Sequence, residues 1–310
     1  MEMVEAKHSP STSGLLARVR RRLSRDNHEP LLPALPVAAR FAERFVSPSL
    51  LRRVQEMEFE DEGHGFDRFG LNPKGVAVGL AITRWLYENW FRVSSHGIEK
   101  VPQHGPVILA ANHSGTIPLD AFMVWTDVVR HGPKGRVPRV VTDHFVPGLP
   151  ILNLLFSRAG AIGGSRGNFH QLLSQDEMIV VCPEGVPGVG KRFADRYKLQ
   201  DWRLGHAELA IEHQATIVPT AVIGAEEQMP QLGRIPVRAF GAPYIPIPAT
   251  PFPLPVHYHI WYGDPIDVGS RFAPEQCRDP DAVRRLAAEV KASVAELIER
   301  GLAERKGVFR

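Results

Sequence analysis

The sequence predicts an α/β protein in which a mixed, largely parallel central sheet is flanked by helices and preceded by an N-terminal helical segment. Two observations lead to this fold class. First, four short runs are almost wholly apolar, which is typical of strands buried on both faces. They are PVILAAN (106–112), RVVTDH (139–144), MIVVC (178–182) and TIVPTAVIG (216–224). Second, helical patterns separate these runs, and such alternation favours α/β layering.

The segments between and after the four runs show helical spacing of apolar residues. In PLDAFMVWTDVVR (118–130), Pro118 stands where a first helical turn accepts proline. The same spacing occurs in WRLGHAELAIEHQ (202–214). DAVRRLAAEVKASVAELIERGL (281–302) predicts a C-terminal amphipathic helix. VHYHIWYG (256–263) alternates with period two and predicts a late or edge strand.

These patterns divide the chain into four parts. Residues 1–38 are rich in Ser, Pro and Arg and predict a basic, mobile tail. Within it, LLARVRRRLSR (15–25) fits either a solvated segment or a helix on anionic lipid. We expect a helical membrane-interface segment over residues 39–94, an α/β domain over 95–270 and the C-terminal helix within 271–310.

The most apolar stretch of the N-terminal third is GVAVGLAITRWLYENWF (75–91). Arg84 and Glu88 interrupt it before it reaches the roughly 18 uncharged residues that a membrane span needs. Trp85 and Trp90 gather near its end. The stretch therefore predicts a helix packed on a core or lying at a membrane interface.

Composition narrows the range of functions. A chain of 310 residues with 44% hydrophobic content can bury one large core. The net charge of +3 is too small to indicate a nucleic-acid partner. The only two cysteines, Cys182 and Cys277, are far apart, which argues against a disulfide framework or a zinc ribbon. No secretory signal is recognisable, so we expect a reducing, cytoplasmic setting.

The stretch CPEGVPGVGKR (182–192) contains GVPGVGK (185–191), which matches the first seven positions of a nucleotide-binding P-loop. Arg192 then stands where the magnesium-binding hydroxyl belongs, and Pro187 removes an amide donor from the loop. Nucleotide hydrolysis is therefore disfavoured.

The stretch GGSRG (163–167) matches the nucleophile motif of α/β-hydrolases, with Ser165 as the nucleophile. Later residues in the required order are Asp201 or Glu226, followed by His257 or His259. The preceding SRAGAI is a poor buried strand, so a glycine-rich loop is the favoured interpretation. A serine hydrolase or esterase remains the alternative function.

The stretch ILAANHSGTIPLDAF (108–122) places His113 at the end of a predicted strand and Asp120 in the first turn of the following helix. The carboxyl edge of a sheet is where α/β folds place their chemistry. Asp120 can accept from one ring nitrogen of His113 and leave the other free as a base. The pair in isolation is equally compatible with a structural role.

Four blocks in order resemble the phospholipid/glycerol acyltransferase family, typified by bacterial, PlsC-type lysophosphatidic acid acyltransferases. The blocks are NHSGTIPLD (112–120), GAIGGSR (160–166), CPEGV (182–186) and IVPTAVIG (217–224). The likeness runs from about residue 95 to 267, and four ordered motifs are more specific than any one of them.

The resemblance implies transfer of a fatty acyl group from acyl-CoA or acyl-ACP to a hydroxyl of a glycerolipid or lysophospholipid. His113 would be the general base and Asp120 would hold its tautomer, so neither cysteine need act as a nucleophile. No cofactor and no metal are implied beyond the acyl donor as co-substrate. The implied partners are the acyl carrier, the lipid acceptor and the inner face of the cell membrane, with peripheral attachment.

The matched blocks also suggest a set of substrate-binding residues. These are Asn112, Ser114, Gly115, Arg166, Glu184, Gly185, Lys191 and Arg192. Arg166 would hold an anionic group of the acceptor or of coenzyme A. Lys191 and Arg192 would replace a cation that the family carries directly after its Glu-Gly pair.

Three departures from the family pattern bear on the substrate. Six residues, rather than four, separate His113 from Asp120, so a longer turn must bring them together. Gly163 and Gly164 replace a bulky pair and should open that wall. Val186 and Pro187 replace Thr-Arg, so the pattern does not identify lysophosphatidic acid as the acceptor. A non-catalytic lipid-binding relative is a further alternative.

Overall fold

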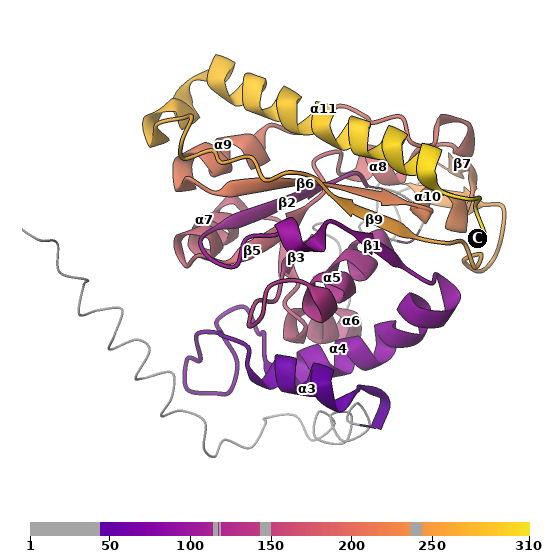
Figure 1. Ribbon diagram of the computed structural model, residues 1–310, viewed down its shortest axis with the longest axis horizontal. Coiled ribbons are helices and arrows are strands. Elements are labelled where there is room, and N and C mark those ends of the chain that lie inside the picture. The colour runs from indigo at the N-terminus through magenta and orange to yellow at the C-terminus, as the bar shows by residue number, and fades with distance from the viewer. Residues whose placement is uncertain (1–43, 114–116, 118, 143–149, 236–243) are drawn as a thin grey trace, which may run out of the picture.

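The computed structural model describes residues 44–113, 117, 119–142, 150–235 and 244–310. Within these residues, seven strands form one sheet in the order β1-β9-β6-β2-β5-β3-β4 (Figure 1). The strands are β1 Ser94–His96, β2 Val107–Ala111, β3 Arg139–Thr142, β4 Ile162–Gly163, β5 Met178–Val181, β6 Thr216–Ile223 and β9 His259–Tyr262. Neighbouring strands are parallel except β6 and β9. The predicted mixed, largely parallel sheet is confirmed.

The four apolar runs of the sequence form β2, β3, β5 and β6. The late strand β9 is not at the edge, because β1 pairs beside it with Ser94 next to His259. β1 and β4 are short and polar or glycine-containing, so neither shows an apolar run in the sequence.

Helices cover both faces of the sheet (Figure 1). On β2, Val107 and Leu109 join the core cluster that packs on one face, while Ile108 and Ala110 join the cluster on the other. The first face carries α3 Pro48–Gln55, α4 Pro73–Trp85, α5 Leu119–His131 and α6 Pro150–Arg158. The second carries α7 Arg166–Ser174, α9 Gly205–His213 and α11 Pro280–Glu304. Every residue of β2 is buried, as expected for a central strand.

Shorter elements complete the described chain. They are the π-helix Leu86–Trp90, the 3-10 helices Ile98–Lys100, Phe193–Asp195 and Pro274–Arg278, and the short helices α8 Val186–Val189 and α10 Ala225–Gln228. Outside the main sheet, β7 Gln231–Ile235 and β8 Ile245–Pro248 form an antiparallel hairpin.

The N-terminal helices pack on the α/β core. Asn72 caps α4 by accepting a hydrogen bond from the backbone N–H of Gly75 at 2.6 Å. Val76 and Leu80 of α4 are buried in the same cluster as β2, whereas Trp85 is 55% exposed. No helix among the described residues is long and apolar enough to cross a membrane. The predicted tail over 1–38 lies outside the described residues.

Two buried carboxylates fix the framework around the site. Asp127 of α5 accepts hydrogen bonds from the hydroxyls of Tyr87, Ser95 and Tyr262 at 2.5, 2.8 and 2.8 Å. These bonds attach α5 to the π-helix, β1 and β9. Asp67 pairs with the fully buried guanidinium of Arg139 on β3. Buried charges of this kind need such partners, since desolvation without them is costly.

Candidate active site

The C-terminal ends of β2 and β5 meet at one edge of the sheet, where Ala110 lies beside Val181. His113 follows β2, and Asp120 lies in the first turn of α5. The Nδ1 atom of His113 is 2.8 Å from Oδ2 of Asp120, whose side chain is 2% exposed. The longer turn between them therefore preserves the contact that the sequence predicts.

The electrostatic environment of His113 favours its protonated form. Burial lowers the pKa of the imidazole, but the neighbouring Cys182 sulfur and the Asp120 carboxylate outweigh burial and raise the pKa well above its usual value. Burial raises the pKa of the Cys182 thiol, so this group carries its proton at neutral pH. The carboxylate of Asp120 is therefore the charge that stabilises an imidazolium here.

Asn112 and Glu184 hold the backbone on either side of the His113–Asp120 pair. The amide of Asn112 donates to the carbonyl of Val222 at 3.0 Å and accepts from its N–H at 2.7 Å, so it extends the pairing of β2 with β6. Glu184 is 1% exposed, and its Oε1 accepts from the N–H of His113 at 3.2 Å. Substrate contact was expected for both residues, but these bonds give them a positioning role.

Lys191 and Arg192, the two cations expected near the substrate, do not line the cavity beside His113. The Nζ atom of Lys191 is 2.9 Å from Glu226 and 3.4 Å from Glu184, in a buried cluster. Burial raises the pKa of Glu226 to about 7, and Lys191 offsets only part of that effect. Arg192 is 70% exposed and pairs with Asp195. Lys191 is directed inward because the buried side chains of Glu184 and Glu226 supply partners for its ammonium group there.

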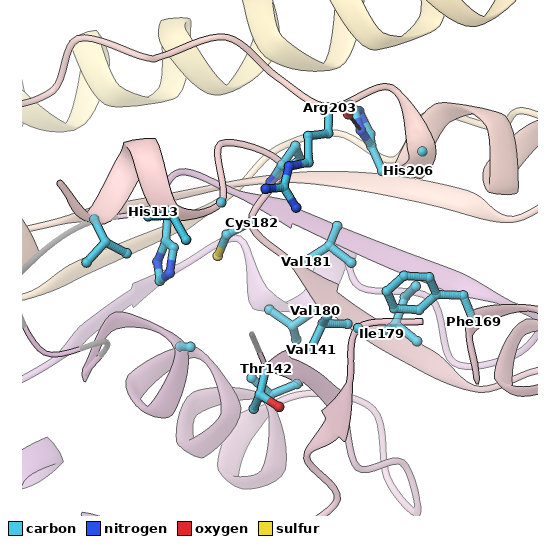
Figure 2. A pocket seen from close by; sticks show the side chains of 18 of the residues that line it. His113, Val141, Thr142, Phe169, Ile179, Val180, Val181, Cys182, Arg203 and His206 are labelled. Atoms are coloured by element: carbon cyan, nitrogen blue, oxygen red, sulfur yellow. Dashed lines mark hydrogen bonds between the residues drawn. The ribbon is translucent and has the colours of Figure 1, made fainter. Parts of the chain in front are cut away.

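A cavity of about 470 Å³ extends from His113 between the sheet and the helices. Figure 2 shows His113 at one end and Phe169 at the other. Most lining side chains are apolar, among them Phe122, Val141, Phe156, Phe169, Ile179, Val181 and Leu209. Burial lowers the pKa of His206 to about 4, so this lining residue is neutral. The volume and lining suit an extended hydrocarbon chain.

The glycine-rich second block contributes to the cavity wall as the sequence predicts. Gly164 lines the cavity, and a Cβ atom there would lie 3.2 Å from the side chain of Val141. A bulky residue at this position would enter the space beside β3. Cys182 also lines the cavity next to His113 and is half-buried (Figure 2).

Two arginines lie at the edge of the cavity. Arg166 lines it and pairs with Glu208 at 2.6 Å, with a side chain that is 60% exposed. Arg203, which the sequence analysis missed, lines it as well (Figure 2). Within the described parts of the chain, no carboxylate pairs with the guanidinium of Arg203. It is therefore available to an anionic group.

Gly185 allows Arg203 to approach. Its backbone has φ 57° and ψ −147°, which side chains disfavour. A Cβ atom at Gly185 would lie 3.3 Å from the guanidinium of Arg203. The backbone N–H of Arg203 donates to Pro183 at 3.0 Å, which fixes the segment beside the turn after β5. In sequence, Arg203 follows the run RFADRYKLQDW, which gives it no local motif.

The residues of the hydrolase alternative are not assembled. Ser165 caps α7 by accepting from the N–H of Asn168 at 3.2 Å, and it does not line the cavity. The Nε2 atom of His257 is instead 2.9 Å from the hydroxyl of Ser94. No histidine of the described residues hydrogen-bonds to Ser165. Ser114 and Gly115, expected to contact substrate, lie outside the described residues.

Two groups of described residues bring three potential metal ligands within 4.8 Å of one another: His113, Asp120 and Cys182, and separately His170, Glu212 and His213. In the second group, the two histidine rings hydrogen-bond to each other at 2.8 Å. Arg166 lies 3.8 Å from Glu212 and supplies a competing cation.

Comparison with known proteins adds family information. The sequence model of a family described as Acyltransferase matches residues 92–223. An uncharacterized protein of Mycobacterium tuberculosis is 33% identical over 258 residues, and the match covers 79% of this chain and 72% of that protein. The human protein named DGAT1/2-independent enzyme synthesizing storage lipids is 29% identical over 218 residues, covering 68% of this chain and 62% of that protein.

The fold also resembles a solved structure. The crystal structure of the 1-acyl-sn-glycerophosphate (LPA) acyltransferase PlsC from Thermotoga maritima matches with a TM-score of 0.50 and 15% identity. The match covers 94% of this chain and 99% of that one. It shows likeness of fold.

Proposed function

Because this chain belongs to the phospholipid/glycerol acyltransferase family, we propose that it moves a fatty acyl group from acyl-CoA or acyl-ACP to a hydroxyl of a glycerolipid or lysophospholipid. The single observation that supports this most strongly is the His113–Asp120 pair at the end of an apolar cavity. The proposed acceptor lipid carries a free hydroxyl group, as does the acceptor of a 1-acylglycerol-3-phosphate acyltransferase.

The chemistry follows from the pair. The Nε2 atom of His113 takes the proton of the acceptor hydroxyl while its oxygen attacks the thioester carbonyl. A tetrahedral intermediate forms and then expels the thiolate of the carrier, which receives the proton from the imidazolium. Asp120 keeps the other ring nitrogen protonated and stabilises the imidazolium as it forms. General-base catalysis of this kind contributes about 10²- to 10⁴-fold.

The apolar cavity would hold the fatty acyl chain with its carbonyl next to His113. Each methylene group buried there contributes about 0.8 kcal/mol of binding free energy. The wall at Gly164 leaves room where a larger side chain would shorten the cavity.

Arg203 and Arg166 would hold an anionic group of the donor or the acceptor. An arginine presents several N–H donors in a plane that matches phosphate oxygens. Arg203, beside Gly185, is the stronger candidate, since no carboxylate of the described residues pairs with it whereas Arg166 is already paired with Glu208. Arg203 therefore takes the role first expected of Lys191 and Arg192.

Lipid acceptors reside in membranes, so we expect the protein to work while attached peripherally to the cytoplasmic face of the cell membrane. The acyl carrier, the acceptor lipid and the membrane surface are then its partners.

The test is release of free thiol from acyl-CoA in the presence of lysophosphatidic acid, other lysophospholipids, monoacylglycerol or diacylglycerol. We expect His113→Ala to abolish acceptor-dependent release, while Ser165→Ala retains it, because Ser165 only caps α7. Arg203→Gln should raise KM for whichever substrate carries the phosphate and leave kcat less affected. Unchanged turnover in folded His113→Ala protein would refute the proposal.

A further inference from the structure

The β7–β8 hairpin presents an apolar face to solvent. On β8, Ile245 and Ile247 are 40% and 41% exposed, whereas Pro246 and Pro248, which alternate with them, are partly buried. Ile235 of β7 lies opposite Ile245 and is 44% exposed. A hairpin with one face in water normally shows the reverse pattern, with polar residues outward.

The apolar surface continues beyond the hairpin. Phe252, in the loop after β8, is 76% exposed. The indole N–H of Trp90 donates to the carbonyl of Pro253 at 3.2 Å, and the Trp90 ring lies 5.1 Å from that of exposed Trp85. We call this surface the apolar rim, consisting of Trp85, Leu232, Ile235, Ile245, Ile247 and Phe252. Exposed apolar patches of this extent mark contact sites.

The part of the chain that includes the hairpin and Phe252 carries basic but no acidic residues. Between Glu227 and Asp264 the sequence contains no acidic residue. Arg234 of β7 lies opposite Pro246, so it is on the face of the hairpin that turns away from the isoleucines, where it is exposed and lies over the ring of Tyr244. A segment that carries apolar and basic but no acidic side chains is complementary to a bilayer that contains anionic lipid.

The rim is also continuous with the cavity. Tyr244 and Pro246 of the hairpin line the cavity that ends at His113. The hydroxyl of Tyr244 donates to the carbonyl of Val186 at 3.4 Å, which holds the hairpin against α8. The inner face of the hairpin thus forms cavity wall while its outer face forms the rim.

We propose that the apolar rim is the surface by which this protein docks on an anionic lipid bilayer, with the isoleucines of the hairpin among the acyl chains. An amphiphilic substrate would then enter the cavity beside Tyr244 directly from the bilayer. The biological meaning rests on the proposed acyltransferase function, but docking itself requires no catalysis. Pro246 and Pro248 lack backbone donors, which disfavours the other obvious occupant, a strand from a second copy of the chain.

The experiment measures co-sedimentation of the full chain with vesicles of equal parts phosphatidylcholine and phosphatidylglycerol. The rim variants are Ile245→Asp/Ile247→Asp and, separately, Phe252→Asp. The control for the isoleucine double variant is Arg284→Gln/Arg285→Gln, because these two double variants change the net charge by the same amount. These arginines are exposed near the start of α11, at the opposite end of the molecule from β7 (Figure 1). Thermal unfolding verifies that each variant is folded.

We expect each rim variant to bind vesicles about tenfold or more weakly than wild type, which corresponds to about 1.4 kcal/mol or more. The arginine control should bind more tightly than the isoleucine variant. The His113→Ala variant should bind like wild type, so failure of the catalytic proposal and failure of docking are separate results. Wild-type binding by folded rim variants would overturn the inference. So would absence of vesicle binding by wild type, or lipid-free self-association that the rim variants abolish.

Discussion

Replacing Asp120 by Asn tests how the His113 pair operates. The substitution keeps the size of the side chain but removes its charge, 2.8 Å from Nδ1 of His113. The variant can no longer stabilise the imidazolium, and the amide can present a donor to Nδ1 and favour the wrong tautomer.

The magnitude follows from the distance. Opposite unit charges separated by 2.8 Å attract by about 6 kcal/mol at an effective dielectric constant of about 20. This is an upper bound on what the pair can contribute, equivalent to roughly 10⁴-fold in rate. General-base catalysis gives about 10²- to 10⁴-fold. We therefore expect kcat/KM to fall by about 10²- to 10⁴-fold.

The pH profile supplies a second readout. Only neutral His113 acts as a base, so kcat/KM rises as pH passes upward through its pKa. Asp120 raises that pKa, hence Asp120→Asn should move the acid limb to lower pH while reducing the maximum. Thiol release from acyl-CoA measures both effects.

The control for Asp120→Asn is Asp264→Asn, which removes a carboxylate that is 90% exposed and paired with Lys100. It should keep wild-type activity and pH profile. A folded Asp120→Asn protein with near wild-type kcat/KM, or with an unmoved acid limb, would refute the mechanism.

Three further predictions concern the framework of the site. Asp67→Ala removes one of two carboxylates that pair with the buried guanidinium of Arg139 and leaves Glu177 at 3.2 Å, so it should lower the free energy of unfolding by about 1–3 kcal/mol, measured by denaturant titration. Gly188→Ala places a Cβ atom 3.0 Å from that of His113 and should lower kcat by roughly 10- to 100-fold in the thiol assay, because α8 must shift. Native Glu226 holds its proton up to about pH 7, whereas the unfolded chain loses it near pH 4.5. The free energy of unfolding should therefore fall between pH 4.5 and 7, by up to about 1.4 kcal/mol per pH unit. Thermal unfolding of Glu226→Gln should show a flatter dependence on pH.

Each of these predictions has a control or a contrary result. Glu62→Ala disrupts an exposed pair and should cost less than about 1 kcal/mol, so an equal loss would contradict the assignment of a buried pair to Asp67. Gly167→Ala meets no atom within 4 Å and should keep kcat; an unchanged kcat in Gly188→Ala would contradict the packing argument. An unaltered pH slope in Glu226→Gln would show that another group titrates.

The sequence was sufficient for features that depend on local patterns. A strand buried on both faces is mostly apolar, so β2, β5 and β6 could be located from their apolar runs, whereas β3 includes Arg139 and Thr142 and was indicated only by the two valines between them. The pairing of His113 with Asp120 could be expected for a similar reason, since a strand end and the next helix start are close in sequence.

Tertiary structure alone decided which way the cations face and what the turn residues bind. Lys191 is drawn inward by Glu184 and Glu226, and the latter lies far along the chain. Arg203 reaches the cavity because the segment carrying it crosses the turn at Gly185.

The same holds for the short strand β1, which displaces β9 from the sheet edge, and for the hairpin that turns Ile245 outward. Alternation of apolar and polar residues indicates that one face of a strand differs from the other. It does not indicate which face packs on the core, because the segments that pack on either face are distant in sequence. The sequence therefore predicted the contact between His113 and Asp120, while the surfaces through which lipid would reach that pair could be identified only in the assembled fold.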